Sequence, residues 1–277
     1  MADLEQAATR HYDKRNLGES ILAALRRMGK DVNALRPEDL APVDAFHVRG
    51  RVATEELARF CQPVAEQRVL DVGCGLGGTA RYLAQEFGCH VVGLDLAPSY
   101  VEAARMLTER LRLAAQVEFR QGSMLELPFE DGSFDLVWSE HAQMNIADKP
   151  RLFAEIHRVL ARGGRLVFHD ILQGTGGAPH YPAPWAADAD ASALIGPAEL
   201  RRLLQSIGFD VKLWEDKTAA GRDAFRKVMA SLREKGPPPL GLHLLLGSVA
   251  PAAQENMLRN LEENRIALLQ AVLEKMR

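Results

Sequence analysis

A glycine-rich turn between a buried strand and a helix constrains this chain more than any other sequence feature. Residues 69–79 read Val-Leu-Asp-Val-Gly-Cys-Gly-Leu-Gly-Gly-Thr, so that Gly73, Gly75, Gly77 and Gly78 follow one another closely. Because glycine has no Cβ, such a turn lets bare backbone lie against a ligand. The run therefore predicts a strand–turn–helix unit with a ligand bound at the turn.

Two acidic residues favour one ligand class over another. Asp71 stands directly before the glycines, where a carboxylate repels a pyrophosphate but suits the amino group of S-adenosylmethionine. Asp95 closes a second apolar run, where an acid accepts hydrogen bonds from ribose hydroxyls. These residues favour a nucleoside–amino acid site over a dinucleotide site. A nicotinamide-dependent oxidoreductase stays open, because Gly78 follows Gly75 at the spacing that class uses.

Buried strands alternate with helices through the middle of the chain, which predicts a parallel α/β sheet covered on both faces. Strands are expected at 68–72, 90–95, 117–121, 133–138, 164–170 and 209–214, and helices at 4–12, 17–28, 51–61, 77–87, 98–113, 149–160 and 197–208. A loop is expected through Pro37 and Pro42, a mobile or capping loop at 172–191, and mostly helix over 218–264. For 265–273 we prefer a closing strand, because strand 209–214 would otherwise lack a partner; helix continuation is the alternative.

Composition narrows the function classes. Hydrophobic residues make up 47% of the chain and its formal net charge is −3, which gives no long-range attraction for nucleic acid. We expect no membrane span and no signal peptide. The three cysteines lack metal-ligand spacing, so reduced thiols, a cytoplasmic location and no metal site are expected.

Three motifs carry a resemblance to a known family. They occupy residues 71–78, residues 122–128 with 134–138, and residues 157–167. Through them the stretch from Val69 to Asp170 resembles the class I S-adenosylmethionine-dependent methyltransferases of the small-molecule type. Residues 46–54 and 138–142 are similar to the sarcosine/dimethylglycine N-methyltransferase group and to related sugar and tocopherol methyltransferases.

The resemblance implies a doubly wound, Rossmann-like α/β fold. Its seven-stranded sheet should be mostly parallel with an antiparallel last strand, accompanied by N-terminal helices and a helical cap insertion. The expected divisions are an N-terminal helical lid (1–50), the S-adenosylmethionine-binding core (51–216), the cap insertion (217–263) and the closing strand of the core (264–277).

The resemblance also implies the residues around the cofactor S-adenosylmethionine, whose product is S-adenosylhomocysteine. They are Asp71, Gly73, Gly75, Asp95, Leu96, Ser123, Met124, Glu140, Tyr12 and His47. Many relatives carry Asp where Ser123 stands, which predicts a weaker or water-mediated contact with the adenine amine. Tyr12 is expected as a lid aromatic, with packing on the sheet as the alternative.

The acceptor side of the site is expected around Glu140 and His141, at the carboxyl end of the fourth strand. We predict His141 as a base or acceptor anchor and Glu140 as a ligand for an amine or the cofactor, with loop stabilisation as the alternative for both. Further acceptor contacts are expected from Asn145, His169, Tyr181 and Trp185. The alternatives are core packing for His169 and loop anchoring for the two aromatics. Many relatives carry His where Asn145 stands. We therefore expect no His-assisted proton transfer at that position.

Two arginines and an apolar stripe complete the candidates. Arg49 or Arg51 could hold a substrate carboxylate, with ordinary surface charge as the alternative. The stripe Leu240–Leu246 is expected in the core or at a homodimer contact.

Together these features predict a methyltransferase acting on a small molecule, with an amine nitrogen slightly favoured. O- or C-methylation of a phenol, quinone or sugar is the main alternative. A nicotinamide-dependent oxidoreductase and a non-catalytic binder are the others.

Overall fold

The fold is that of a computed structural model of the chain, in which residues 16–276 are described. Seven strands form one sheet in the order β3-β2-β1-β4-β5-β7-β6. They are β1 (Arg68–Val72), β2 (His90–Asp95), β3 (Val117–Gln121), β4 (Phe134–Glu140), β5 (Leu160–Gln173), β6 (Phe209–Asp216) and β7 (Ile266–Lys275). Strands β1 to β5 pair in parallel, whereas β7 runs antiparallel to both β5 and β6. The expected sheet and its closing strand are confirmed.

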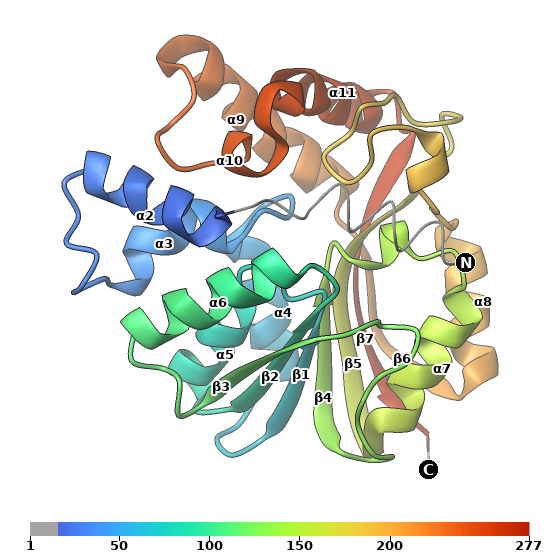
Figure 1. The fold of residues 1–277 in the computed structure, drawn as a ribbon. Helices are drawn as coiled ribbons and strands as arrows, with labels where there is room; N and C mark the ends of the chain where they lie inside the picture. Colours follow the sequence, from blue (N-terminus) through green and yellow to red (C-terminus); the bar gives the residue numbers. More distant parts are fainter. Residues whose placement is uncertain (1–15, 277) are drawn as a thin grey trace.

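Helices cover both faces of this sheet, because neighbouring strand residues point to opposite sides. Val69 packs with helices α4 (Arg51–Cys61), α5 (Gly78–Phe87) and α6 (Pro98–Arg110). Leu70 packs instead with α7 (Lys149–Val159) and α8 (Pro197–Ile207). Figure 1 shows the two groups of helices on opposite sides of the sheet.

The helix expected at 4–12 lies outside the described residues, and from residue 16 to residue 50 one element differs from its prediction. Helix α2 (Leu17–Arg27) matches, but Pro37–Asp44 forms helix α3 where a loop was expected. Proline is tolerated in the first turn of a helix, and Pro37 stands there. The backbone N–H of Arg36 donates to Asp39 Oδ2 at 2.9 Å, which closes the first turn. Pro37 therefore begins the helix and Pro42 lies inside it, so neither proline prevents the helix from forming.

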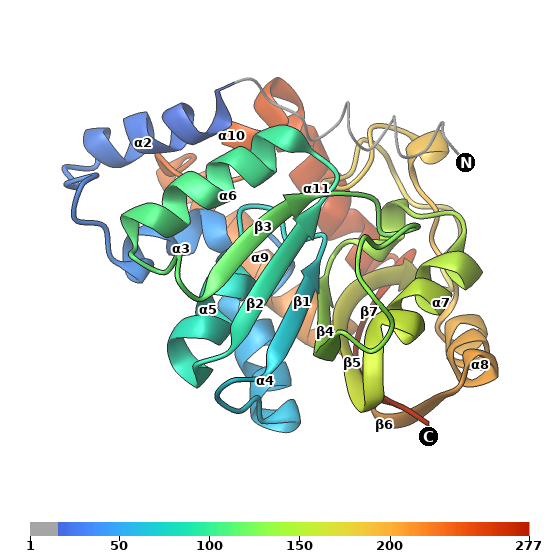
Figure 2. The same ribbon diagram turned by 60° about the horizontal axis from the view of Figure 1, so that its bottom comes forward.

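A helical insertion lies between β6 and β7, in the segment expected to be the cap, and it is called the cap below. It contains α9 (Thr218–Lys235), α10 (His243–Leu246) and α11 (Ala250–Glu262), with the 3-10 turn η3 (Gly247–Val249) between the last two. Figures 1 and 2 show these helices gathered beyond the carboxyl ends of the parallel strands. Leu240, Leu245 and Leu246 are buried against α2, α3 and α6, so the apolar stripe is core. Within residues 16–276, no helix combines the length and apolarity that crossing a bilayer requires.

Candidate cofactor and acceptor site

The glycine turn connects β1 to α5 and is held by backbone hydrogen bonds. The N–H groups of Gly73 and Cys74 donate to Leu94 O at 2.8 and 3.1 Å. Gly73 has a φ of +71°, and a Cβ built there would lie 2.4 Å from Ala142 Cβ. Both the left-handed backbone and the close approach require glycine at this position.

Asp95 ties the end of β2 to the same turn. Its Oδ2 accepts from the N–H of Gly75 at 2.9 Å, and its Oδ1 accepts from the N–H of Ala97 at 2.9 Å. Burial raises the pKa of Asp95, although the two amides oppose that shift. The second acid of the sequence motif therefore lies against the turn, as its spacing from the first predicts.

Asp71 is a buried acid without a full set of partners. Its residue is 2% exposed, and its Oδ2 atom has no hydrogen-bond partner among residues 16–276. Burial, followed by the charges of Glu140 and Asp95, raises the pKa of Asp71 well above its usual range. A cationic group at the turn would relieve this cost, so the residues present fit the amino group and sulfonium of S-adenosylmethionine.

Glu140 is the centre of a hydrogen-bonded cluster. Thr54 Oγ1 lies 3.0 Å from each of its carboxylate oxygens, and Thr79 Oγ1 donates to Oε2 at 2.6 Å. His47 Nε2 lies 3.5 Å from the same Oε2 atom. Thr54 belongs to α4 and Thr79 to the first turn of α5, so Glu140 joins three elements around the site. This geometry supports the loop-stabilising alternative for Glu140 and also leaves the carboxylate beside the cavity.

His141 has the geometry of a proton acceptor. It adopts a φ of +49°, an uncommon backbone for a residue with a side chain. Its Nε2 atom is buried without a hydrogen-bond partner in the described part of the chain. Burial, then the neighbouring rings of His169 and His47, lowers the pKa of His141 well below 6.5. The imidazole is therefore neutral near pH 7 and able to accept a proton.

Two buried charged residues hold the loop that carries His141. Asp170 accepts from the N–H groups of Ala142 at 3.1 Å and Gln143 at 3.0 Å. Lys149 Nζ donates to Gln143 O at 2.6 Å, to Ala193 O at 2.7 Å and to Ile146 O. Burial raises the pKa of Asp170 to about 6 and lowers that of Lys149 to about 8. Sequence reasoning missed Lys149, because a lysine that opens a helix is normally exposed.

A cavity of about 230 Å³ opens at the carboxyl ends of the strands and brings most of the predicted residues together. The predicted residues that line it are His47, Asp71, Gly73, Gly75, Asp95, Leu96, Met124, Glu140, His141, Asn145 and Trp185. The cap adds Phe225, Leu242, Leu245, Leu246 and Met257. Sequence periodicity could not identify the cap residues, because it does not say how an insertion folds back over a sheet.

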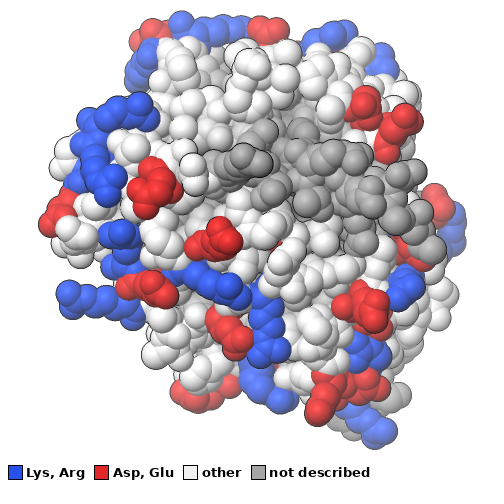
Figure 3. All heavy atoms as spheres, in the orientation of Figure 1, with Lys and Arg blue, Asp and Glu red and all other residues white. Residues whose placement is uncertain are grey.

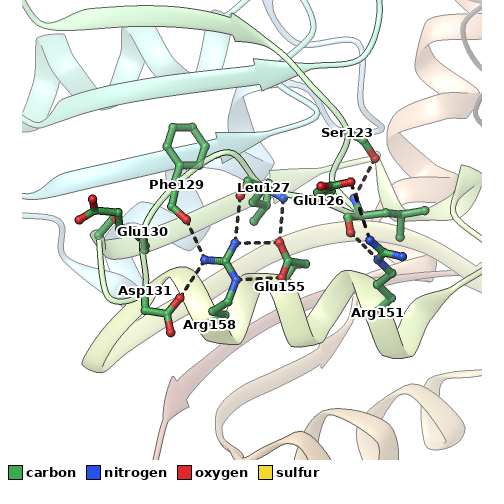
Figure 4. A network of polar contacts seen from close by, with 11 residues as sticks. Ser123, Glu126, Leu127, Phe129, Glu130, Asp131, Arg151, Glu155 and Arg158 are labelled. Atoms are coloured by element: carbon green, nitrogen blue, oxygen red, sulfur yellow. Dashed lines mark hydrogen bonds and ion pairs between the residues drawn. The ribbon is translucent and has the colours of Figure 1, made fainter.

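Ser123 lies outside that lining, in the loop that follows β3. Its Oγ atom accepts from the N–H of Leu125 at 3.0 Å, so the side chain shapes the loop. Figure 4 shows two arginines of α7 holding this loop in place. Arg158 donates to Leu127 O at 2.9 Å and to Phe129 O at 2.7 Å, and Arg151 donates to Leu125 O at 2.6 Å. The neighbouring Met124 lines the cavity instead.

His169 does not line the cavity, in agreement with its core-packing alternative. It is fully buried, with Nε2 3.0 Å from Val48 O and Nδ1 3.3 Å from Leu269 O. Burial lowers the pKa of His169 to about 4. Its ring meets that of His47 edge-on at 5.9 Å and lies tilted against that of His141 at 5.0 Å.

The loop before α8 is packed into the structure. Trp185 is 1% exposed and lines the cavity. Tyr181 lies outside the lining, with its ring 6.3 Å from that of Trp185. Asn145 Nδ2 donates to Trp185 O at 2.7 Å and Ala191 O at 2.9 Å, so Asn145 anchors this loop. The lid candidate Tyr12 falls outside the described residues.

A larger hollow of about 490 Å³ lies elsewhere, beside Arg68 and His90 at the first residues of β1 and β2. None of the predicted site residues lines it. Ligands of open α/β sheets bind outside the carboxyl ends of the strands, so the smaller cavity is the candidate site.

Comparisons with known proteins agree with this assignment. Residues 70–168 match the family model described as a methyltransferase domain. The chain is 30% identical to the sarcosine/dimethylglycine N-methyltransferase of Halorhodospira halochloris over 191 residues, covering 69% of this chain and 68% of that protein. It is 40% identical to the chloroplastic tocopherol O-methyltransferase of Arabidopsis thaliana over 131 residues, covering 45% of this chain and only 38% of that protein.

A solved structure matches along almost the whole chain. The [4+2]-cyclase SpnF superposes with a TM-score of 0.70 and 18% identity, covering 99% of this chain and 97% of that one. At 18% identity, this similarity shows a shared fold and says nothing about a shared reaction. Because that protein is described as a cyclase, the reaction has to be argued from the site.

Proposed function

The chain belongs to the S-adenosylmethionine-dependent methyltransferases, and we propose that it methylates a small-molecule acceptor held between the sheet edge and the cap. One observation carries this proposal. The glycine turn, the Asp71 Oδ2 atom that has no partner among residues 16–276, the neutral imidazole of His141 and the cap helices all line a single cavity. Such a cavity places a cofactor and a small acceptor side by side.

On the cofactor side, the chain's residues bind and orient. Asp71 would hold the amino group, Asp95 the ribose hydroxyls, and Leu96 and Met124 the adenine. When bound, S-adenosylmethionine supplies a methyl group on a positively charged sulfur. Glu140 keeps a carboxylate beside the cavity through its bonds to Thr54 and Thr79.

On the acceptor side, we favour an amine nitrogen as the nucleophile. Methylation of a neutral amine moves positive charge from sulfur to nitrogen. The carboxylates of Asp71 and Glu140 line the same cavity and stabilise that charge after the transfer. A methylated primary or secondary amine then loses its extra proton to solvent, so nitrogen transfer needs no base from the chain.

A hydroxyl acceptor is the second candidate, and His141 itself favours it. A phenol or alcohol must lose its proton for efficient transfer, and a neutral imidazole whose Nε2 atom has no partner in the described part of the chain supplies the base. Of the two similar proteins reported above, one is named an N-methyltransferase and the other an O-methyltransferase. Both kinds of nucleophile therefore belong in the test.

Small acceptors are proposed in preference to nucleic acids. On the face drawn in Figure 3, the basic and acidic side chains of the described residues are intermixed. A nucleic-acid surface would gather basic side chains along one stripe. We also propose that residues 1–50 serve as a lid and residues 217–263 as the cap of the acceptor site.

The test is to follow S-adenosylhomocysteine formation over a panel of amines, phenols, quinones and sugar hydroxyls. Turnover of at least one amine or hydroxyl is expected, together with calorimetric binding of S-adenosylmethionine. Binding of the cofactor with no turnover across the panel would favour a non-catalytic binder. Binding of NAD in place of S-adenosylmethionine would favour the oxidoreductase.

A further inference from the structure

We infer that the acceptor is a largely apolar molecule without an anionic group. The inference rests on the proposed function and names the acceptor class of the same site. It excludes free amino acids and phosphate esters as good substrates. Three features of the cavity carry it.

The first feature is the apolar wall that the cap contributes. Leu245 and Leu246 of α10 are each 5% exposed, and Met257 of α11 is 1% exposed. Trp185, also 1% exposed, and the half-buried Phe225 of α9 complete the wall. With the cofactor on the glycine turn, an acceptor has to lie against these side chains. An apolar acceptor is stabilised by burying its surface against this wall.

The second feature is the sign of the charges at the opposite wall. Four acids line the cavity, namely Asp44, Asp71, Asp95 and Glu140. Asp44 is paired with Arg81 at 2.5 Å, whereas Asp71 has an oxygen without a partner among residues 16–276. The charges of Glu140 and Asp95 already help to raise the pKa of Asp71. An acceptor carboxylate or phosphate would add one more negative charge to a site that disfavours it.

The third feature is the position of the two arginines that were candidates for holding a carboxylate. Arg49 Nη1 and Nη2 reach Glu56 at 2.8 and 2.5 Å, which is a bidentate pair. The guanidinium of Arg51 stacks over the ring of Tyr82 at 4.5 Å. Neither arginine belongs to the cavity lining. Burial lowers the pKa of His47 and of His141, so both imidazoles in the lining are neutral. The described lining therefore offers an anion no cationic side chain.

The experiment compares acceptors that differ only in charge. Sarcosine is paired with its ethyl ester, and 4-hydroxybenzoate with its methyl ester, so that each nucleophile appears with and without a carboxylate. We expect kcat/KM for the ester to exceed that for the acid by at least about tenfold in a pair that turns over. Binding of the same pairs to protein saturated with S-adenosylhomocysteine is followed by calorimetry, and it should show the same preference.

A charge placed in the apolar wall sharpens the test. Phe225→Arg puts a guanidinium on the cavity side of α9 and should shift the preference toward the acid by at least about fivefold. Val228→Arg is the matched control, because Val228 lies on the same helix, is 46% exposed and is not part of the cavity lining. It should leave both the preference and the thermal unfolding temperature unchanged.

The outcomes separate this inference from the proposed function. A preference for the acids in the wild-type protein would overturn the inference, and methyl transfer would still stand. Failure of every ester to bind or react would also overturn it. Failure to bind S-adenosylmethionine would instead remove the proposed function.

Discussion

The two ends of the cavity differ in what builds them. At the cofactor end, formed by Asp71, Gly73, Gly75 and Asp95, contacts come from backbone amides and two acids within one strand–turn–helix–strand unit. At the acceptor end, formed by Trp185, Phe225, Leu245, Leu246 and Met257, the wall comes from side chains of separate segments. The first can be encoded by a short motif, whereas the second depends on how distant segments pack. Changes at the cofactor end should therefore alter cofactor binding, and changes at the acceptor end should alter selectivity.

Gly73→Ala should give the largest effect. Its Cβ would meet Ala142 Cβ at 2.4 Å and would also carry the strain of a φ of +71°. We expect S-adenosylmethionine affinity to fall by at least about 100-fold, measured by calorimetry. Gly163→Ala is the control, because Gly163 has the same φ of +71° but nothing within 4 Å of its added Cβ. Equal losses in the two variants would show that the close approach at the turn does not matter.

His141→Ala should act on turnover and leave cofactor affinity intact. We expect kcat to fall by about 100-fold with a hydroxyl acceptor, and by less with an amine, because only the first needs its proton removed before transfer. With a hydroxyl acceptor, the lowered pKa of His141 also predicts a wild-type kcat that stays level as the pH falls from 8 through 6.5. A wild-type rate that halves near pH 6.5 would contradict a buried, neutral imidazole.

Lys149→Met tests the support of the His141 loop. Three backbone carbonyls lose their donor and Asp170 loses its buried counter-charge, so the free energy of unfolding should fall by about 2–4 kcal/mol in urea titrations. Arg151→Met is the control, because that side chain is 51% exposed and should cost less than about 1 kcal/mol. Similar losses in both variants would remove the special role of Lys149.

Asp71→Asn should give the smallest effect and changes stability and binding in opposite directions. The folded-state pKa of Asp71 is raised above 3.8, so the protein without ligand loses stability as the pH rises from about 3.8 up to that folded-state pKa, because the unfolded chain ionises first. At pH 8 the free energy of unfolding of the variant should exceed that of the wild type. This difference should shrink toward acid pH. Its S-adenosylmethionine affinity should be about tenfold weaker. A variant that is less stable at pH 8 would contradict an isolated buried carboxylate.

The same contrast explains which parts could be predicted from the sequence. Gly73, Asp71 and Asp95 line one cavity, and the sequence places them together because their positions follow from local strand and turn geometry. The closing strand β7 was predicted because an edge strand needs a partner. Helix α3 was missed because its two prolines suggested a loop, although one of them suits a first helical turn.

The acceptor end was predicted only in part, and the reason is physical. Trp185 was expected near the acceptor, but its partner Tyr181 lies outside the cavity lining. Whether a side chain faces a cavity depends on contacts such as those of Asn145 with Trp185 and Ala191, which join residues far apart in the chain. Periodicity within one segment carries no information about such contacts.

The central claim is that an acid beside a bare-backbone turn selects a positively charged sulfur donor over a dinucleotide. Calorimetric titration of the wild-type protein with S-adenosylmethionine and, separately, with NAD tests it most directly. The account predicts saturable binding of S-adenosylmethionine that S-adenosylhomocysteine displaces, and no heat from NAD. Saturable binding of NAD together with no response to S-adenosylmethionine would contradict it.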